Sequence, residues 1–511
     1  MSLHRSLGSA ALWLALAAAA PAAEEASSLQ AALNSVTDAD LRKHVGALAD
    51  DTFEGREAGS RGGRAASIYL GKEFQRFGLR GAGDRGGYYQ VFGAGYRNIL
   101  GWIEGSDPQL KNEYILVGAH YDHVGYGSSQ NSYGPTGYIH NGADDNASGT
   151  SALLEIAEGI ATSGLKPRRS ILFALWDAEE KGLLGSKHWV GAPTILLNQI
   201  RLVINTDMLG RMRRNRLEVA GTRSASGLRR AISSQNEGTD LWLDFTWELK
   251  DNSDHWPFYE RRIPILMMHT GLHDDYHRPS DDAEKVNVDG LRQASQFMVR
   301  VVMALADANE LPRFRLAARN ENEHRQREVE QPAAPLPGRL GLRWDEQDKS
   351  GQGVRVAAVT PGAAAAQAGL RAGDRILTWN DLPVLSGDQL RSLALSSENP
   401  VIVGIARAGQ EQPQPVTVNL GGKPVRIGIA WRTDDAEPGA VILNRVVPGS
   451  PADKAGLRVH DRIYQLAGNN FADEREFIAR LQEAAGPVEV VYERFGKLGT
   501  ATMQLPGAGP Q

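Results

Sequence analysis

Residues 114–122 read YILVGAHYD, an apolar run that ends in polar side chains. The first six residues are too continuously apolar for a strand with one solvated face, so they predict a strand buried on both faces. Three further segments have the same character and are also predicted to be buried strands: 170–176 (SILFALW), 201–205 (RLVIN) and 263–268 (IPILMM).

Helix-like stretches alternate with these strands between residues 24 and 309. Residues 148–160 place Leu153, Ile156 and Ile160 at helical spacing, and residues 291–305 form a second amphipathic pattern that would close the domain. This alternation predicts an α/β domain whose mostly parallel mixed sheet is flanked by helices.

Polar residues follow each predicted strand at the point where it ends. They are His120 and Asp122 after the first strand, Asp144 and Asp145 before the first helix, Glu179 and Glu180 after the second strand, Asp207 after the third, and His273, Tyr276 and His277 after the fourth. In open α/β sheets the ligand crevice lies at the carboxyl ends of the strands. We therefore expect these segments to converge on one site.

So many acidic groups in one place would repel one another unless a divalent cation offset their charge. Imidazole and carboxylate donors without thiolate suit zinc, with manganese or cobalt as substitutes. The carboxylates exceed what a single tetrahedral zinc needs. That surplus favours two metal ions that share a bridging carboxylate and activate a common water.

Glu179 and Glu180 cannot have the same chemical role, because neighbouring side chains of an extended or turning backbone point in different directions. One can bind metal while the other acts as the general base toward the attacking water. The spacing of His120 and Asp122 fits a metal ligand and the carboxylate that orients it.

The ordered motifs resemble the co-catalytic di-zinc aminopeptidases of peptidase family M28, which also holds glutamate carboxypeptidases and glutaminyl cyclases. The resemblance covers residues 51–309 and rests on segments that occur in the family's order. These are DTFEGR at 51–56, GAHYDHVG at 118–125, GADDNASG at 142–149, WDAEEKGLLGS at 176–186, NTDM at 205–208 and YHRPSD at 276–281.

Carried over residue by residue, the resemblance implies two zinc ions per chain. It implies His120 and Asp207 as ligands of one zinc, Glu180 and His277 as ligands of the other, and Asp145 as the bridge. It also implies Glu179 as the general base, Asp122 as the residue that orients His120, and Tyr276 as a residue that stabilises the tetrahedral intermediate.

Neighbouring polar residues have plainer interpretations. Asp144 remains an alternative to Asp145 as the bridge. Three further histidines are predicted to support the ligands or to lie on the surface: His123, His255 and His273. Asp254 lies either near the substrate pocket, as the resemblance implies, or in a structural hydrogen-bonded pair. Residues 281–282, both aspartate, are predicted to be a solvated surface pair.

The C-terminal part of the chain repeats itself. RLGL at 339–342 corresponds to RIGI at 426–429, and AGL at 368–370 corresponds to AGL at 455–457, each with an offset of 87 residues (426 − 339; 455 − 368). One register shared by separate pairs indicates a duplicated module, predicted at 338–421 and 424–507. The charged, proline-bearing residues 310–337 are predicted to be a linker.

The duplicated module resembles PDZ domains, which are small and mainly β. In such domains a loop of backbone N–H groups holds the carboxylate of a peptide's C-terminus while the peptide adds as a strand. C-terminal peptides are therefore the expected ligands of both modules. The alternative is a PDZ fold that only packs against the enzyme or another subunit.

The composition of the chain excludes thiol chemistry and argues against nucleic acid as a partner. The 511 residues contain no cysteine, which excludes thiol catalysis, and the net charge of −5 gives no field that favours nucleic acid. His4 and Arg5 precede an apolar run, so residues 1–23 predict a cleaved signal peptide and export to the periplasm or the medium. An uncleaved anchor is the alternative, but no stable membrane anchor is expected.

The sequence thus predicts an exported zinc-dependent exopeptidase. A site rich in carboxylates suits the free amine of a peptide or protein N-terminus, which makes aminopeptidase the leading activity. The alternatives are a carboxypeptidase or glutaminyl cyclase of the same fold, or an inactive peptide-binding scaffold.

Overall fold

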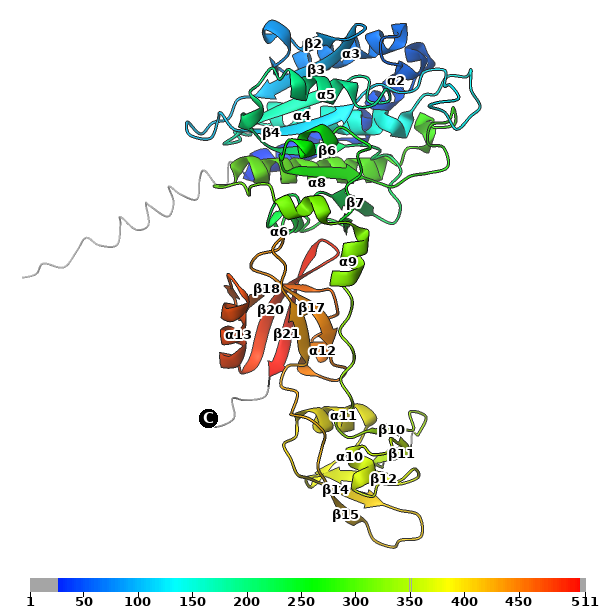
Figure 1. Ribbon diagram of the computed structural model, residues 1–511, viewed down its shortest axis with the longest axis vertical. Coiled ribbons are helices and arrows are strands. Elements are labelled where there is room, and N and C mark those ends of the chain that lie inside the picture. The colour runs from blue at the N-terminus through cyan, green and yellow to red at the C-terminus, as the bar shows by residue number, and fades with distance from the viewer. Residues whose placement is uncertain (1–25, 349, 351, 506–511) are drawn as a thin grey trace, which may run out of the picture. The chain divides into compact units, whose positions relative to one another are not determined.

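The computed structural model describes residues 26–348, 350 and 352–505, and the predicted signal peptide at 1–23 lies outside them. Two compact units are present (Figure 1). The first comprises residues up to Gln326 together with Phe495–Lys497, and the second contains the remainder from Arg327. Across these described ranges, no helix is both long and apolar enough to cross a bilayer.

A nine-stranded sheet forms the centre of the first unit. Its strands are β1 (Arg80–Gly81), β2 (Tyr89–Phe92), β3 (Tyr96–Ile103), β4 (Tyr114–His120), β5 (Ser170–Trp176), β6 (Ile200–Thr206), β7 (Arg216–Ala220), β8 (Trp242–Thr246) and β9 (Ile265–His269). The strand order is β1-β3-β5-β4-β6-β9-β7-β8, with β2 paired to β3. The four predicted strands are confirmed as β4, β5, β6 and β9.

The central strands β5, β4, β6 and β9 are parallel to one another, while β3 and β7 join them antiparallel. Every residue of β4 and β5 is buried, as expected for strands covered on both faces. The register pairs His120 with Trp176 and Gly118 with Asn205. The carboxyl ends of these strands therefore meet at one edge of the sheet.

Helices cover both faces of the sheet. They include α2 (Asp38–Leu48), α3 (Arg61–Arg76), α4 (Gly149–Thr162), α5 (Leu184–Gly191), α6 (Leu228–Ser233), α7 (Trp256–Glu260) and α8 (Val288–Asp307). Side chains of α2, α3, α4 and α8 pack into the larger core, and Trp176, Trp189 and Phe258 form the centre of the smaller core with α5 and α7. The predicted mixed α/β architecture is confirmed.

The segment predicted to be a linker contacts folded structure in both units. In the first unit, Arg315 N–H donates to the Ser224 carbonyl at 2.8 Å and Leu311 is buried. In the second unit, Ala333 N–H donates to the Asn444 carbonyl at 2.8 Å. A short helix, α9 (Glu323–Val329), lies between these contacts along the chain.

The second unit contains two six-stranded sheets with the same strand order. The first module has β10 (Leu342–Trp344), β11 (Val354–Val359), α10 (Ala364–Gln367), β12 (Arg375–Trp379), β13 (Leu382–Pro383), α11 (Gly387–Ser396), β14 (Val401–Ala406) and β15 (Gln414–Val418). The second has β16 (Ile429–Arg432), β17 (Val441–Val446), α12 (Pro451–Lys454), β18 (Arg462–Leu466), β19 (Asn469–Asn470), α13 (Glu474–Glu483), β20 (Gly486–Arg494) and β21 (Lys497–Leu505).

Buried polar contacts repeat with the same offset. Arg407 binds Asp374 as Arg494 binds Asp461, and both differences equal 87 (494 − 407; 461 − 374). Each copy has its own apolar core. The predicted duplication of a small, mainly β module is therefore confirmed.

Candidate metal centre

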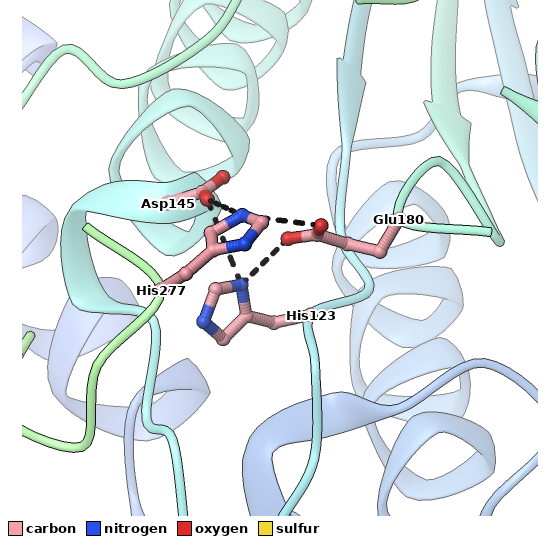
Figure 2. A group of neighbouring side chains, drawn as sticks. All are labelled: His123, Asp145, Glu180 and His277. Carbon is pink, nitrogen blue, oxygen red and sulfur yellow. Dashed lines mark hydrogen bonds and ion pairs between the residues drawn. The ribbon is translucent and has the colours of Figure 1, made fainter. Parts of the chain in front are cut away.

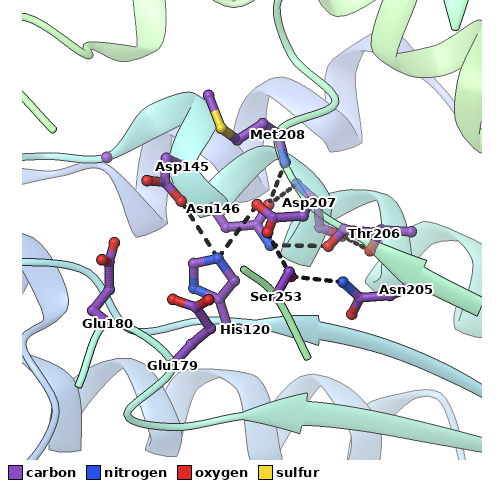
Figure 3. A network of polar contacts seen from close by, with 12 residues as sticks. His120, Asp145, Asn146, Glu179, Glu180, Asn205, Thr206, Asp207, Met208 and Ser253 are labelled. Atoms are coloured by element: carbon purple, nitrogen blue, oxygen red, sulfur yellow. Dashed lines mark hydrogen bonds and ion pairs between the residues drawn. The ribbon is translucent and has the colours of Figure 1, made fainter. Parts of the chain in front are cut away.

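The carboxyl edge of the parallel strands gathers the predicted site residues. His120 is the last residue of β4, Glu179 and Glu180 lie just beyond β5, and Asp207 follows β6 directly. Figure 3 shows these side chains facing one another together with Asp145, which precedes α4. The parallel register brings them together, as the sequence predicted.

Asp145 lies between two histidines. Its Oδ1 is 3.4 Å from His120 Nε2, and its Oδ2 is 3.0 Å from His277 Nε2. His277 Nε2 is also 3.2 Å from Glu180 Oε2. One carboxylate thus faces both groups of donors, which is the geometry a bridging ligand requires.

The neighbouring Asp144 faces elsewhere. Its Oδ2 is 3.1 Å from His273 Nε2, and its Oδ1 accepts hydrogen bonds from Gly210 N–H and Ser148 Oγ–H. Between the two aspartates, this geometry favours Asp145 as the bridge. His273 is accordingly a buried support of the loop and not a surface residue.

Asp281 corrects one expectation from the sequence. We predicted a solvated surface pair, yet Asp281 is fully buried. Its Oδ2 accepts hydrogen bonds from the backbone N–H groups of Asp144 (2.9 Å) and Asp145 (3.1 Å), and its Oδ1 accepts one from Arg211 (2.8 Å). The buried carboxylate therefore fixes the backbone of the bridging loop.

His277 is oriented by a loop that precedes α4. Its Nδ1–H donates to the Asn131 carbonyl at 2.9 Å, while Tyr133 N–H donates to the His277 carbonyl at 3.0 Å. With Nδ1 occupied in this way, Nε2 faces the carboxylates. Histidines that bind metal usually have such a partner on the second ring nitrogen.

His123 was predicted either to support a ligand or to lie on the surface, and the surface alternative is wrong. It is only 1% exposed, and its Nδ1 lies 2.9 Å from Glu180 Oε1 and 3.8 Å from Asp145 Oδ2. Figure 2 shows its ring directed into the same space as His277. Within the GAHYDHVG motif, no signal separated this histidine from a supporting one.

Asp207 is oriented by Ser253, a residue that no sequence pattern marked for this role. Ser253 Oγ–H donates to Asp207 Oδ2 at 2.6 Å, and Asn205 Nδ2–H donates to Ser253 Oγ at 2.8 Å (Figure 3). The other oxygen, Oδ1, lies 3.4 Å from His120 Nε2. The chain thus fixes which oxygen faces the histidine.

Asp122 contacts both His120 and the glutamate turn. Its carboxylate is 3.9 Å from His120 Nδ1, and the backbone carbonyl of Asp122 is nearer to that nitrogen, at 3.2 Å. The carboxylate accepts hydrogen bonds from Glu179 N–H (2.9 Å) and Glu180 N–H (3.4 Å). Asp122 therefore fixes the backbone that presents the two glutamates.

The electrostatics of the site are dominated by negative charge. Burial raises the pKa of Glu179 well above its usual value, and the carboxylates of Glu180, Asp254 and Asp207 add to that rise. Burial and the nearby Asp177 likewise raise the pKa of Asp122. Protein groups alone thus leave the charge of these carboxylates uncompensated.

Asp145 behaves in the opposite way. Burial opposes its ionisation, yet hydrogen bonds from His120 and His277 hold its pKa well below the usual value. For His277, burial would lower the pKa, but hydrogen bonds to Asp145 and Glu180 raise it to about 11. The bridging position is therefore charged and attractive to a cation.

Among the described residues, three groups of donors could hold a metal ion; His44, Glu155 and Glu158 lie apart from this edge of the sheet, and the other two lie at it. One consists of His123, Asp145, Glu180 and His277, and the other of His120, Glu179 and Asp207, with the donor atoms of each group within 4.8 Å of one another. We refer to them as the His277 group and the His120 group. Buried imidazole and carboxylate donors without thiolate are the ligands that zinc accepts.

Tyr276 lies beside the His277 group. Its ring stacks on that of His277 with centroids 4.0 Å apart, and Tyr133 lies against both rings at 5.9 and 6.1 Å. Burial raises the pKa of the Tyr276 hydroxyl above its usual value. The hydroxyl therefore keeps its proton and can serve as a hydrogen-bond donor.

A second candidate site lies in the second unit. A cavity of about 940 Å³ runs beside β10 and α11, where Leu340, Leu342, Trp344, Leu390 and Ala394 contribute to its lining. The RLGL segment at 339–342 forms one of its walls. An apolar groove between a strand and a helix can accept an extended peptide.

Comparison with known proteins bears on both sites. Residues 98–302 match the family described as Peptidase family M28, and residues 355–407 and 442–494 each match a PDZ domain. Leupeptin-inactivating enzyme 1 of Streptomyces exfoliatus is 29% identical over 282 residues, which is 53% of this chain and 58% of that protein.

Two further relatives match shorter stretches. Aminopeptidase YwaD of Bacillus subtilis is 27% identical over 227 residues, 42% of this chain and 46% of its own length. A probable glutamate carboxypeptidase, VP8 of Zea mays, is 39% identical over 97 residues, 18% of this chain and 11% of its own length. The chain thus spans less than two thirds of the curated relatives that it matches.

Proposed function

Because the chain carries a peptidase family M28 domain followed by two PDZ domains, we propose that the protein is an exported di-zinc aminopeptidase. The observation that carries the proposal is the position of Asp145 between the two donor groups, with an oxygen facing a histidine of each. The apolar, small-residue pattern at residues 1–23 supports export.

The predicted ligands fall into two sets under this proposal. His120 and Asp207 would hold one zinc, Glu180 and His277 would hold the other, and Asp145 would be shared between them. Zinc bound there supplies Lewis acidity, which polarises a peptide carbonyl and makes a water acidic near neutral pH. The uncompensated carboxylates supply the charge that retains it.

Glu179 is the proposed general base. Its side chain lies in the His120 group. Its backbone N–H donates a hydrogen bond to the Asp122 carboxylate, which fixes the position of Glu179. Its carboxylate takes a proton from the attacking water and passes that proton to the leaving amine, so that no net proton is gained or lost. Tyr276 would donate its hydroxyl proton in a hydrogen bond to the oxygen that develops negative charge.

Aminopeptidase specificity is favoured over carboxypeptidase specificity by charge. A carboxypeptidase needs a cation for the carboxylate of its substrate, but the two arginines beside the bridging loop are occupied. Arg56 donates to four backbone carbonyls, and Arg211 pairs with Asp275 and Asp281. An acidic site instead suits the ammonium group of a peptide N-terminus.

The PDZ domains are proposed to bind peptide C-termini. The RLGL loop at 339–342 would hold the terminal carboxylate, and the groove beside β10 and α11 would accept the preceding apolar side chains. Peptides or protein N-termini would then be substrates at the metal centre and peptide C-termini ligands at the second unit.

The test uses one peptide in free, N-acetylated and C-amidated forms, incubated with the full chain in zinc buffer and followed by mass spectrometry. Stepwise loss of residues only from free N-termini is expected. Loss from the other end of the acetylated peptide would contradict the aminopeptidase assignment. The absence of any cleavage, with zinc bound, would contradict the peptidase proposal.

A further inference from the structure

His123 faces the donors of the His277 group but belongs neither to the predicted ligand set nor to the predicted base. The position of its ring is fixed by close packing against the backbone of Gly142. The backbone at Gly142 comes so close that a Cβ there would meet the His123 ring at 2.5 Å, and Gly142 has φ = +54°. A side chain at position 142 would displace the ring from the site.

The ring aims one nitrogen at the donors of the His277 group. Nδ1 lies 2.9 Å from Glu180 and 3.8 Å from Asp145, and the rings of His123 and His277 meet edge to face with centroids 5.5 Å apart. Two imidazoles therefore approach the same two carboxylates from different directions (Figure 2).

The spacing of donor atoms fits a shared cation. In a tetrahedral zinc site with ligands at 2.0–2.1 Å, neighbouring donor atoms are about 3.3–3.4 Å apart. His277 Nε2 is 3.0 and 3.2 Å from its two carboxylate partners, and the His123 distances of 2.9 and 3.8 Å bracket the ideal value. At the other position, His120 Nε2 is 3.4 Å from both Asp145 Oδ1 and Asp207 Oδ1, which fits equally well.

We propose that His123 is a fourth protein ligand at the His277 position and that the two metal positions are therefore unequal. Four donors would complete a tetrahedral shell in the His277 group. At the other position Asp145, His120 and Asp207 supply three, because Glu179 is assigned there as the base and not as a ligand. Three protein ligands with one open position is the usual form of a catalytic zinc site, and four is that of a structural one.

This inference rests on the proposed zinc peptidase function and adds an order of binding to it. The His277 position retains its zinc more tightly. The open position, where water and substrate exchange, lies on the His120 side next to the general base. Removal of zinc by a chelator should then proceed in two separate phases.

The substitution His123→Asn distinguishes a metal ligand from a residue that only donates a hydrogen bond. The asparagine amide can place an N–H near the position of Nδ1 and keep the contact with Glu180, but it is a poor zinc ligand. The experiment measures zinc retention of the full-length wild type, His123→Asn and His123→Ala during titration with a chelator, together with the number of imidazoles bound to zinc by X-ray absorption. His188→Asn is the matched control, because that ring stacks on Phe92 outside both groups.

Three imidazoles for two zinc ions are expected in the wild type, and two in His123→Asn. The tighter zinc should weaken by more than about 100-fold in both variants, beyond the 10–100-fold expected for a residue that only orients a ligand. Retention within 100-fold, or two imidazoles in the wild type, would overturn the inference.

The wild-type imidazole count decides the question even if a variant fails to fold. It also separates the two levels of the argument. A chain that binds two zinc ions through two imidazoles and removes N-terminal residues would contradict the role of His123 alone. A chain that binds no zinc would contradict the proposed function itself.

Discussion

Buried histidines face buried carboxylates both between α2 and α4 and at the candidate metal centre of the first unit. At the first, His44 of α2 faces Glu155 of α4, with Nε2 and Oε1 3.5 Å apart. At the second, His120 and His277 face Asp145. Burial is nearly complete at His44, Glu155, His120 and Asp145, yet their charges differ.

The His44–Glu155 pair responds to burial by becoming neutral. Burial lowers the pKa of His44 to about 4 and raises that of Glu155 to about 8. Nδ1 of His44 contacts the Tyr69 hydroxyl at 2.6 Å, and the nearby Glu158 carboxylate is bound by Arg76. Near pH 7 neither member needs a counter-ion.

The metal centre cannot neutralise itself in this way. Burial alone would lower the pKa of His120, but the carboxylates of Glu179, Asp207 and Asp145 raise it well above its usual value. The backbone N–H of Asp145 donates to the buried Asp281 carboxylate, and the Asp122 carboxylate accepts a hydrogen bond from Glu179 N–H, so both residues are held in place. Burial by itself thus yields a neutral pair, whereas a fixed excess of carboxylates leaves negative charge that a cation would offset.

Glu179→Gln makes the largest expected change to the metal centre. Glutamine keeps the shape of the side chain but cannot accept the proton of the attacking water, so kcat should fall by about 10²–10⁴-fold. Zinc content, measured on the same preparation, should be unchanged. Equal turnover in the variant would show that Glu179 is not the base, and loss of zinc would show that it is a ligand.

Zinc removal separates the two buried groups. If zinc is present at 1,000 times its dissociation constant, binding adds about 4 kcal/mol to the free energy of unfolding. A chelator should therefore lower the thermal unfolding temperature of the full chain. The same decrease is expected in Glu155→Gln, because a neutral His44–Glu155 pair would not retain zinc. A smaller decrease in that variant would break the comparison.

Ser253→Ala should weaken zinc binding at the His120 position and not at the His277 position. Ser253 donates to Asp207 and leaves the other oxygen of that carboxylate toward His120, so its loss should reduce zinc affinity by about 10–100-fold. Chelator titration measures this change. Ser233→Ala, a buried serine of α6 outside both donor groups, should bind zinc like the wild type.

The sequence predicted the strands and the convergence of the residues at their ends, because both depend on short segments. Continuous apolar runs identified β4 and β5, and the residues at their ends could be assigned to one site because parallel strands align their carboxyl ends. These are properties of short segments and of a sheet rule, so one sequence was sufficient.

Residues whose role depends on distant neighbours were missed. Asp281 binds the N–H of Asp145 from 136 positions away, and its sequence context, beside another aspartate, resembles a solvated surface. His123 lies three residues from His120 but gains its position from Gly142 and Glu180. Burial of a polar group is decided by tertiary contacts, which a local pattern does not contain.

The smallest expected effect is a pH dependence that belongs to the His44–Glu155 pair. Because the pKa of Glu155 is about 8 when folded and near 4.5 when unfolded, the folded state binds the extra proton, and stability falls as pH rises toward 8. The pKa of His44 is about 4 when folded and near 6.5 when unfolded, so its contribution to stability is lost as pH falls from 6.5 toward 4. Below pH 6.5 the two residues change the free energy of unfolding in opposite directions as pH rises. Above pH 6.5 only Glu155 makes it depend on pH.

Glu155→Gln removes this dependence, since glutamine imitates the protonated carboxyl group at every pH. Between pH 6.5 and 8 the wild type should lose about 1–2 kcal/mol relative to the variant, measured as the difference in free energy of unfolding. Glu158→Gln, on the same helix but at a partly exposed carboxylate bound by Arg76, should keep the wild-type slope. If Glu155→Gln kept that slope as well, the pair would be charged after all, and the distinction between a self-neutralised pair and a cation site would fail.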